Sequence, residues 1–316
     1  MPSGTLLGPG RRTRAPVRLP GPAAPRRRRG DGRAAAFFAS PSLIGLTLFT
    51  LFPIVMSLVI AFFKWPAAGP HEFTGISNFT RLLNDPVFRR ALFNTVLFVV
   101  LYLPLNLVVS VGLAVWLTPR IRGQRLLRVL FFLPVVTPMV ANVIVWRLIY
   151  QPDGLIDGTV KAVTGSHAPN FLGERGWAMA AVVAMSVWQG FGYNMLVFSA
   201  ALDAIPQQLV DAAQIDGAGP WRMFLRIKLP LISPALFFAT TMTLITSFQV
   251  FTQPFLLTGG GPGTDTETLM MFVYNQGFSV FQFGLASAAA WILFVLILGV
   301  TAVQFVGQRR WVNYDV

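Results

Sequence analysis

Six long apolar segments dominate this chain, and they restrict its fold more than any other feature of the sequence. Each is long enough to cross a bilayer core of about 30 Å, which takes about 20 apolar residues in a helix. They lie near residues 36–63, 91–117, 128–149, 177–201, 231–257 and 284–306. We therefore predict an all-α polytopic membrane protein with six transmembrane helices.

The composition supports this class and excludes several functions. Of the 316 residues, 54% are hydrophobic and only 12% are charged, whereas soluble domains carry about 25% charged residues. The absence of cysteine excludes disulfides, thiolate metal sites and a cysteine nucleophile. The net charge of +13 raises the question of nucleic acid, but many basic residues lie in the first 33 positions and in short loops. We therefore expect no nucleic-acid partner.

The basic residues also indicate the orientation in the cell membrane. If the spans alternate, the tail to Arg33, the loop with Arg120 and Arg122, the loop at 203–228 and the pair Arg309-Arg310 share one side. Cytoplasmic loops carry an excess of lysine and arginine, so both termini are predicted to be cytoplasmic.

The same pattern divides the chain into four regions. We expect a disordered basic cytoplasmic tail at 1–33, a first transmembrane helix with an outer loop at 34–90, a transmembrane core at 91–306 and a short cytoplasmic tail at 307–316. The apolar run 34–63 is too long for the apolar region of a cleavable secretory signal, so it is read as a retained helix.

The loop at 203–228 is unusually polar for this chain. Burying six charges near the middle of the bilayer would cost roughly 15–20 kcal/mol, so the loop must lie outside the hydrocarbon. Pro206 suits the start of a first short helix, Gly217 its end and Pro220 the start of a second, which Leu229-Pro230 would end. The six charged residues are Asp203, Asp211, Asp216, Arg222, Arg226 and Lys228.

Two interpretations of this helix-turn-helix remain open from the residues alone. Leu209, Ala212 and Ala213 share one face of the first helix, and an apolar stripe that includes Trp221 and Phe224 runs along the second. The segment is either an amphipathic hairpin resting on the membrane surface or a protrusion that fits the cleft of another protein.

Three stretches resemble a known family. The sequence Asp211-Ala-Ala-x-x-Asp-Gly-Ala218, followed by Phe224-x-x-Ile227-x-Leu-Pro230, resembles the EAA loop of bacterial ABC-importer permeases, with Asp211 where the family usually has the longer glutamate. Residues 78–95, ending in Asn94-Thr95, and residues 258–269, beginning Thr258-Gly-Gly-Gly-Pro-Gly, are similar to two further segments of the sugar-type subgroup. The resemblance covers most of residues 37–306 and indicates the maltose and glycerol-phosphate permease subgroup.

This resemblance implies a role for the loop at 203–230 between the fourth and fifth spans. It would dock into a cleft on a cytoplasmic ATPase subunit, with Ala212 and Ala213 as contact positions and Gly217 as the bend. The residues carried over are Asp211, Ala212, Ala213, Asp216, Gly217, Ala218, Phe224, Ile227, Leu229 and Pro230.

The resemblance also implies the partners and the division of labour. They are a second homologous permease, two ATPase subunits that bind ATP and Mg²⁺, an extracellular solute-binding protein, a carbohydrate substrate and membrane lipid. The chain has no G-x-x-x-x-G-K-[ST] phosphate loop, so we expect it to bind no cofactor or metal and to be a transport subunit rather than an enzyme. Transport would proceed by alternating access.

The spans offer a weaker indication of the substrate. No charged residue occurs from Leu229 to Thr264; this weighs against the alternative of an ion-coupled secondary carrier, which often places acids in its bundle. Polar pairs at helical spacing, such as Asn106/Ser110, fit either hydrogen bonding between helices or a pathway for a neutral polyhydroxyl compound. The pathway candidates are Asn142, Trp146, Gln189, Tyr193, Gln249 and Gln253.

Two further expectations concern single residues. An intramembrane enzyme would need a nucleophile beside a base, but His71 and His167 fall in predicted outer loops. Prolines within the predicted spans, including Pro138 and Pro254, are expected to kink the helices.

Overall fold

The computed structural model describes residues 4, 31–118, 123–310 and 312. Most of the predicted basic tail, together with Arg120 and Arg122, lies outside these residues. The chain divides into two units, residues 1–54 and residues 55–316, and each is described by itself.

Residues 31–54 of the first unit are helical. α1 (Asp31–Leu46) begins inside the region assigned to the tail and continues through a π-helical turn, η1 (Thr47–Leu51), into α2 (Phe52–Ile60), which crosses the unit boundary. Ala36–Ile60 forms an apolar helix of 25 residues, long enough to span a membrane. Its apolar side chains are largely exposed, as expected of a helix that faces lipid.

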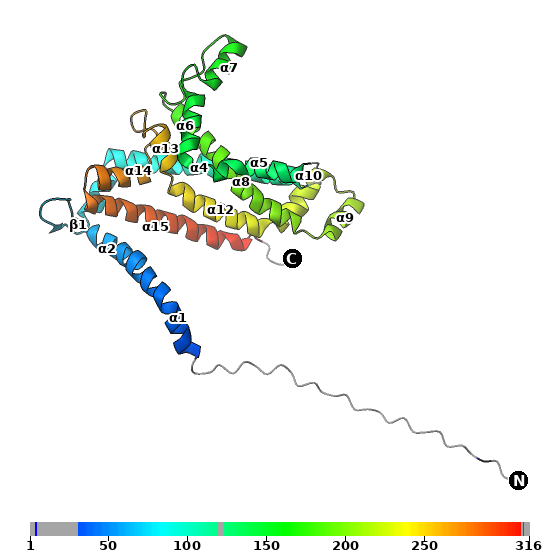
Figure 1. The fold of residues 1–316 in the computed structure, drawn as a ribbon, viewed down its shortest axis with the longest axis horizontal. Helices are drawn as coiled ribbons and strands as arrows, with labels where there is room; N and C mark the ends of the chain where they lie inside the picture. The colour runs from blue at the N-terminus through cyan, green and yellow to red at the C-terminus, as the bar shows by residue number, and fades with distance from the viewer. Residues whose placement is uncertain (1–3, 5–30, 119–122, 311, 313–316) are drawn as a thin grey trace. The chain divides into compact units, whose positions relative to one another are not determined.

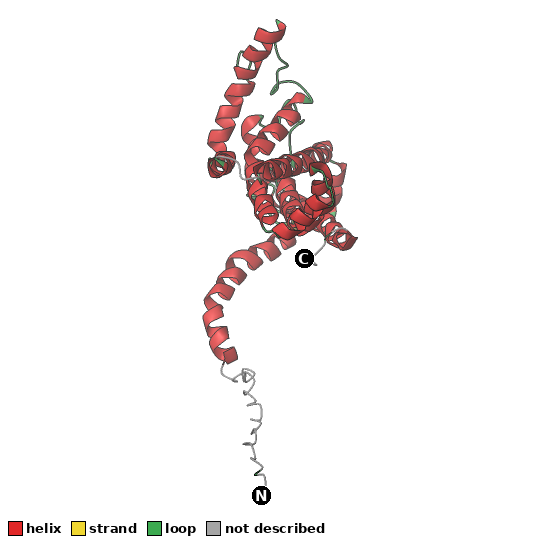
Figure 2. Cartoon of the chain, turned by 90° about the vertical axis from the view of Figure 1, so that its right-hand side faces the viewer, coloured by secondary structure: helices red, strands yellow, loops and turns green. Residues whose placement is uncertain are grey.

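Four long helices form the body of the second unit, where they lie side by side (Figure 1). They are α4 (Pro86–Leu117), α8 (Trp177–Asp203), α12 (Ser233–Phe248) and α15 (Phe283–Gly307). Helices make up most of the described chain (Figure 2). This confirms the predicted all-α membrane class.

Shorter elements join the long helices. A two-stranded antiparallel hairpin pairs β1 (Phe63–Lys64) with β2 (Glu72–Phe73). The short helices are α3 (Ser77–Asn84), α5 (Gln124–Val136), α6 (Met139–Tyr150), α7 (Leu155–Thr164), α9 (Gln207–Ile215), α10 (Pro220–Met223), η2 (Phe224–Lys228), α11 (Leu229–Leu231), α13 (Thr252–Leu257), α14 (Leu269–Tyr274), η3 (Asn275–Ser279) and η4 (Gln308–Arg310).

A buried polar network joins three of the long helices. The Asn194 side-chain amide donates to Oδ1 of Asn106 at 2.7 Å and to Oγ1 of Thr243 at 2.9 Å. The Ser110 hydroxyl, one turn along from Asn106, donates to the Phe191 carbonyl at 2.9 Å. The Asn106/Ser110 pair therefore hydrogen-bonds between helices, one of the two roles considered for such pairs.

The predicted third span is not one straight helix. Among the described residues, four helices are each long and apolar enough to cross a membrane: Ala36–Ile60, α4, α8 and α15. The number rises to as many as six if each of two bent helix pairs is counted as one span. The chain bends by 96° between α5 and the segment Met139–Thr164, which contains α6 and α7; the break lies at Thr137-Pro138. Pro138 has no N–H for the carbonyl of Pro134, four residues earlier, and the Asn142 amide donates to that carbonyl at 3.2 Å instead.

The expected helix end at Leu229-Pro230 was wrong. The chain stays helical through Pro230 and bends by 70° after Leu231, at Ile232. The preceding residues form a π-helical turn in which the Leu229 N–H bonds to the Phe224 carbonyl, five residues back. This wider turn accommodates the proline ring that would clash in a regular helix.

Candidate functional site

A polar cavity lies where the fifth predicted span breaks. Its volume is about 280 Å³, and its polar lining comes from Tyr102, Thr246, Ser247, Thr252 and the two glutamines Gln249 and Gln253. None of its lining residues is charged. Amide and hydroxyl groups without charge can hydrogen-bond a neutral polar molecule but cannot neutralise an ion.

Pro254 and Thr268 explain the break in the helix. α12 ends at Phe248, and α13 begins at Thr252. Pro254 has no N–H for the carbonyl of Val250, four residues earlier. The Thr268 hydroxyl donates to this buried carbonyl at 2.8 Å, so the interrupted backbone remains satisfied.

The predicted pathway residues separate into two groups. Gln249 and Gln253 do not share one continuous helix, as the spacing suggested, yet the break brings both to the polar cavity. Asn142 is 3% exposed, and its side-chain amide donates hydrogen bonds to the carbonyls of Pro134 and Thr137.

The other three candidates lie elsewhere. The Trp146 ring packs against Trp188 with ring centroids 5.6 Å apart. Gln189 is half-buried and Tyr193 is exposed on α8. Like Asn142, these residues do not line the polar cavity.

Sequence reasoning missed Tyr102 and the hydroxyl residues of the cavity. Thr246 and Thr252 lie close to the two glutamines in the sequence, so this cluster of polar residues in an apolar span could have indicated a polar cavity. Tyr102 comes from α4 and offered no such signal, because only packing brings it to α12.

A loop at residues 258–268 is held by hydrogen bonds to α4, and this contact joins the two segments, 78–95 and 258–269, that resemble the sugar-type subgroup. The Asn94 amide donates to the carbonyls of Thr264 at 2.7 Å and Glu267 at 2.9 Å. The Leu269 N–H donates to the Thr95 hydroxyl at 2.8 Å. The loop is therefore positioned by α4, close in sequence to the break that forms the cavity.

Two ion pairs reinforce this loop. Asp265 accepts from Arg90 at 2.7 Å and lies 3.6 Å from Arg175. Burial raises the pKa of the neighbouring Glu267 above its ordinary range, since desolvation disfavours the carboxylate.

The loop predicted to dock an ATPase is a helix-turn-helix at the end of the bundle opposite to β1 and α14 (Figure 1). α9 ends in a Schellman motif, in which Ala218 N–H bonds to Ala213 O and Gly217 N–H bonds to Gln214 O. Gly217 has a φ of 73°, which favours glycine, and Pro220 opens α10. These local predictions are confirmed.

The exposure of the loop residues differs between its two helices. Asp211, Ala212, Asp216 and Gly217 are exposed, whereas Ala213 is buried. Asp211 accepts a 2.9 Å hydrogen bond from Gln207, one turn earlier in α9. The residues that are half-buried are Ala218, Phe224, Ile227, Leu229 and Pro230.

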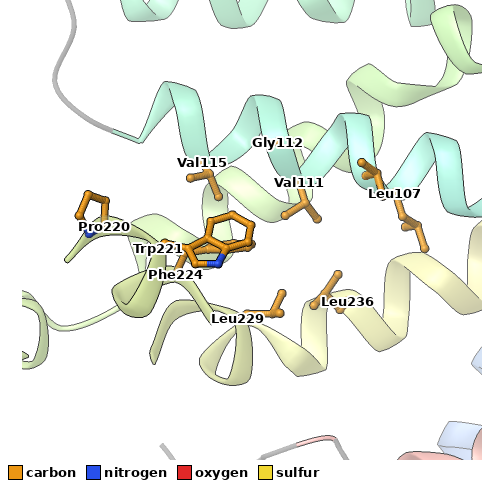
Figure 3. A pocket seen from close by; sticks show the side chains of 10 residues that line it. Leu107, Val111, Gly112, Val115, Pro220, Trp221, Phe224, Leu229 and Leu236 are labelled. Carbon is orange, nitrogen blue, oxygen red and sulfur yellow. The ribbon is translucent and has the colours of Figure 1, made fainter. Parts of the chain in front are cut away.

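The second helix of this loop lies along an apolar groove. Pro220, Trp221 and Phe224 face α4 across the groove, which Figure 3 shows together with its other lining residues. The groove thus belongs to the second helix of the segment, whereas the exposed residues Asp211, Ala212 and Asp216 lie on or next to α9.

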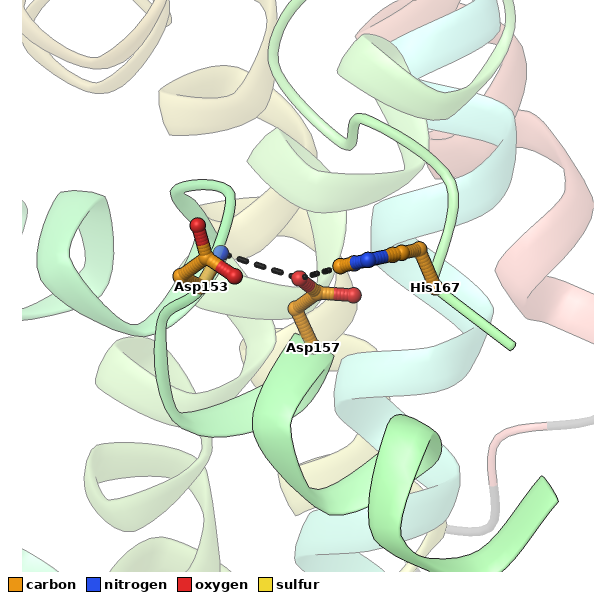
Figure 4. Close-up of side chains that lie close together, drawn as sticks. All are labelled: Asp153, Asp157 and His167. Atoms are coloured by element: carbon orange, nitrogen blue, oxygen red, sulfur yellow. Dashed lines mark hydrogen bonds and ion pairs between the residues drawn. The ribbon is translucent and has the colours of Figure 1, made fainter. Parts of the chain in front are cut away.

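Asp157 organises the segment from Asp153 to Ala168 (Figure 4). Its carboxylate accepts from His167 Nδ1 at 2.9 Å and from the backbone N–H groups of Asp153 and Ala168 at 2.9 and 2.7 Å. These bonds hold the pKa of Asp157 down at about 2. The ligand atoms of Asp153, Asp157 and His167 lie within 4.8 Å of one another, but Asp157 already uses both oxygens to organise the backbone.

Comparisons with known proteins agree with this architecture. A sequence model of the family described as "Binding-protein-dependent transport system inner membrane component" matches residues 108–312. The chain is 34% identical over 272 residues to the probable ABC transporter permease protein YurN of Bacillus subtilis, covering 84% of this chain and 93% of that protein.

Two relatives have names that include a substrate. The sn-glycerol-3-phosphate transport system permease protein UgpA of Yersinia pestis is 37% identical over 279 residues, covering 82% of this chain and 93% of UgpA. The lactose transport system permease protein LacF of Rhizobium radiobacter is 31% identical over 278 residues, covering 86% and 93%.

The fold matches that of solved transporters. A chain in the crystal structure of a bacterial alginate ABC transporter, in complex with an alginate pentasaccharide-bound periplasmic protein, superposes with a TM-score of 0.80 at 20% identity. That match covers 91% of this chain and 99% of the other.

Proposed function

Because this chain belongs to the family of inner-membrane components of binding-protein-dependent transport systems, we propose that it forms the path by which a neutral sugar or polyol enters the cell. It is a permease subunit of an ABC importer. The relatives and solved structures named above are all described as transport-system permeases or ABC transporters, which favours the importer over a secondary carrier.

The uncharged polar cavity is the observation that supports the substrate class. Gln249, Gln253 and Thr252 offer amide and hydroxyl groups that can pair with sugar hydroxyls. A phosphorylated substrate such as glycerol phosphate would need a cation in the lining, because a charge without a partner is costly to desolvate. A neutral polyhydroxyl compound therefore suits the cavity better.

The energy is supplied by a separate pair of cytoplasmic ATPase subunits, which bind ATP and Mg²⁺. Exposed α9 side chains, Ala212 among them, form the docking surface, and both termini lie on the same cytoplasmic side. A second homologous permease completes the path, and an extracellular solute-binding protein delivers the substrate to the opposite end of the bundle. ATP and the loaded binding protein shift the population between inward-facing and outward-facing states.

The test is the double variant Gln249→Leu/Gln253→Leu. Losing two hydrogen-bonding groups, at about 1 kcal/mol each, lowers uptake of the transported sugar by about tenfold or more at low substrate concentration. Gln189→Leu is the matched control, because that half-buried amide lies outside the cavity lining. Copurification of the ATPase reports whether each variant still assembles. Normal uptake by an assembled double variant would reject the cavity as the path.

A further inference from the structure

A small polar pocket lies at the end of the bundle opposite to the helix-turn-helix, between β1, α3 and the start of α15 (Figure 1). Its volume is about 140 Å³, whereas pockets that hold drug-sized ligands measure roughly 300–1,000 Å³. Its polar lining comes from Lys64, Trp65, Asn78, Arg81 and Gln282. The pocket therefore suits a small polar group rather than a sugar ring or an acyl chain.

The walls of this pocket are fixed by contacts that do not involve a cation. The Asn78 amide of α3 donates to the carbonyls of Ala61 at 2.8 Å and Phe63 at 2.9 Å. The N–H of Phe283, the first residue of α15, donates to the Trp65 carbonyl at 2.9 Å. These bonds join β1 and the residue after it to α3 and α15, so the pocket keeps its shape without a ligand.

Two cationic side chains line the pocket without a counter-ion. Lys64 and Arg81 are exposed, and neither forms an ion pair with an acidic side chain in the part of the chain that the structure describes. Glu72 lies opposite Lys64 in the hairpin register but makes no such pair there. Two like charges in one small pocket repel each other, and an anion between them replaces this repulsion by attraction. The lining therefore favours a small anion.

Two neutral donors belong to the same lining. Gln282 carries a side-chain amide and Trp65 an indole N–H, and both residues are half-buried. The Trp65 ring is stacked on His71 with centroids 3.9 Å apart, which holds the indole in place. Oxyanions accept several hydrogen bonds at once, and those from charged donors are roughly twice as strong as neutral ones. An oxyanion is thus the kind of anion that this set of donors suits.

The position of the pocket in the chain points to the source of the oxyanion. Lys64 follows closely on the apolar helix Ala36–Ile60, and Gly284 belongs to the first turn of α15, another candidate span. The pocket therefore lies near the ends of two spans, where tryptophan is enriched. The positive-inside rule does not explain cations at this end, which is the outer one. The oxyanion that is concentrated at this level is the phosphate of lipid headgroups.

We propose that this pocket binds one phosphate group between Lys64 and Arg81, on the outer side of the membrane. The headgroup of an outer-leaflet phospholipid supplies it, and a soluble phosphate has the same chemistry. Gln282 and Trp65 donate to the remaining oxygens. The bound phosphate links β1, which follows the first span, to α15, which forms the last. The inference rests on the proposed function only for the outer placement of this end.

Native mass spectrometry of the full chain tests the lipid source. The chain is delipidated in mild detergent and titrated with phosphatidylglycerol. Lys64→Gln/Arg81→Gln should bind the first phosphatidylglycerol about 30-fold more weakly than the wild type, because each cation near a headgroup contributes about fivefold. Arg89→Gln/Lys161→Gln is the matched control, since it removes two exposed cations outside the pocket lining. This control should bind like the wild type.

Inorganic phosphate tests the soluble source. It is titrated into the delipidated chain while the Trp65 fluorescence is followed as the difference between the wild type and Trp65→Phe. A saturable response that Lys64→Gln/Arg81→Gln lacks would identify a soluble phosphate as an occupant. Phosphatidylglycerol binding without such a response would identify the lipid alone. Glu72→Gln should tighten binding of either probe, because it removes the negative charge opposite Lys64.

Two results would overturn the proposal. One is equal binding of both probes by the wild type and Lys64→Gln/Arg81→Gln. The other is an equal loss in Arg89→Gln/Lys161→Gln, which would mean a general effect of charge. Lys64→Arg/Arg81→Lys retains both cations and should keep most of the binding, which separates lost charge from lost fold.

The sidedness of the pocket is measured separately. The chain has no cysteine, so Lys64→Cys can be labelled by an impermeant maleimide in right-side-out and in inverted vesicles. Labelling in the inverted vesicles alone would reject the orientation in the proposed function but not phosphate binding. Labelling in the right-side-out vesicles together with unchanged binding by Lys64→Gln/Arg81→Gln would reject the phosphate site alone.

Discussion

The hydroxyl of Thr268 donates a 2.8 Å hydrogen bond to the carbonyl of Val250, 18 residues earlier in the chain. Both residues are buried, and the carbonyl has no helical partner because Pro254 lacks an N–H. The next N–H, that of Leu269, donates to Thr95 of α4. The loop at residues 258–268, the broken helix and α4 are therefore joined at one point beside the polar cavity.

Thr268→Val is expected to destabilise the chain by about 1–3 kcal/mol, because it leaves a buried carbonyl unsatisfied while keeping the side-chain volume. Thr268→Ser retains the hydroxyl and should cost less. Thermal unfolding in detergent measures both. A Thr268→Val midpoint equal to that of the wild type would contradict the role of this hydrogen bond.

Gly192 allows α8 to approach α5 closely. A Cβ at this position would lie 2.5 Å from the Phe131 carbonyl oxygen and 3.1 Å from Cγ2 of Val135. Gly192→Ala should therefore destabilise the chain by about 1–3 kcal/mol through overpacking. Gly299→Ala, where a Cβ meets no atom within 4 Å, should be neutral or slightly stabilising, since alanine favours helix. Equal unfolding midpoints of the two variants would contradict the close contact.

The hydrogen bonds of Asp157 lead us to expect a pH-dependent stability of residues 153–168, the segment that includes α7. Its pKa in the folded chain, about 2, lies below the ordinary value of 3.8, so its contribution to stability is present above pH about 4 and is lost as the pH falls toward 2. Hydrogen exchange of residues 153–168 should be flat from pH 5 to 7, after correction for intrinsic rates, and should accelerate below pH 4.

Asp157→Asn is the control for this pH effect. The variant should exchange faster than the wild type at pH 7 and should lose the acceleration below pH 4, because residue 157 then has no carboxylate to be protonated. If the variant kept the wild-type pH profile, another group would be responsible.

Ala212 tests the proposed docking face of α9. The residue is exposed, so Ala212→Trp should leave the fold intact. An indole in a fitted interface costs about 1–3 kcal/mol, which corresponds to about tenfold weaker copurification of the ATPase. Gln214→Trp is the matched control, because it is also exposed on α9 but lies on the opposite face. Equal losses in both variants would argue against a specific Ala212 face.

Much of the fold follows from local sequence. The helices α4, α8 and α15 need only their apolar length, since a chain in lipid has no other way to pair its backbone groups over such a run. The turn of the helix-turn-helix could also be predicted from the sequence, because Gly217 and Pro220 act through their own backbone preferences.

The breaks were decided by tertiary structure. A proline in the sequence indicates that the carbonyl four residues earlier has no backbone N–H to accept from. The chain bends at a proline where another group donates to that carbonyl instead. Asn142 does so for Pro134, and Thr268 does so for Val250 from a separate loop. The sequence marks Pro138 but does not reveal the distant hydroxyl or amide that makes its bend stable.

The candidate pathway shows the same division. Spacing alone made Asn142 and Gln249 equivalent, as polar residues in apolar spans. Packing then commits the amide of Asn142 to backbone carbonyls, while the break after Phe248 places Gln249 and Gln253 at the cavity with Tyr102 of α4. The sequence by itself determined the membrane class and the family pattern. Only the tertiary structure decided which polar side chains remain available to a ligand, because that depends on which buried groups already need them.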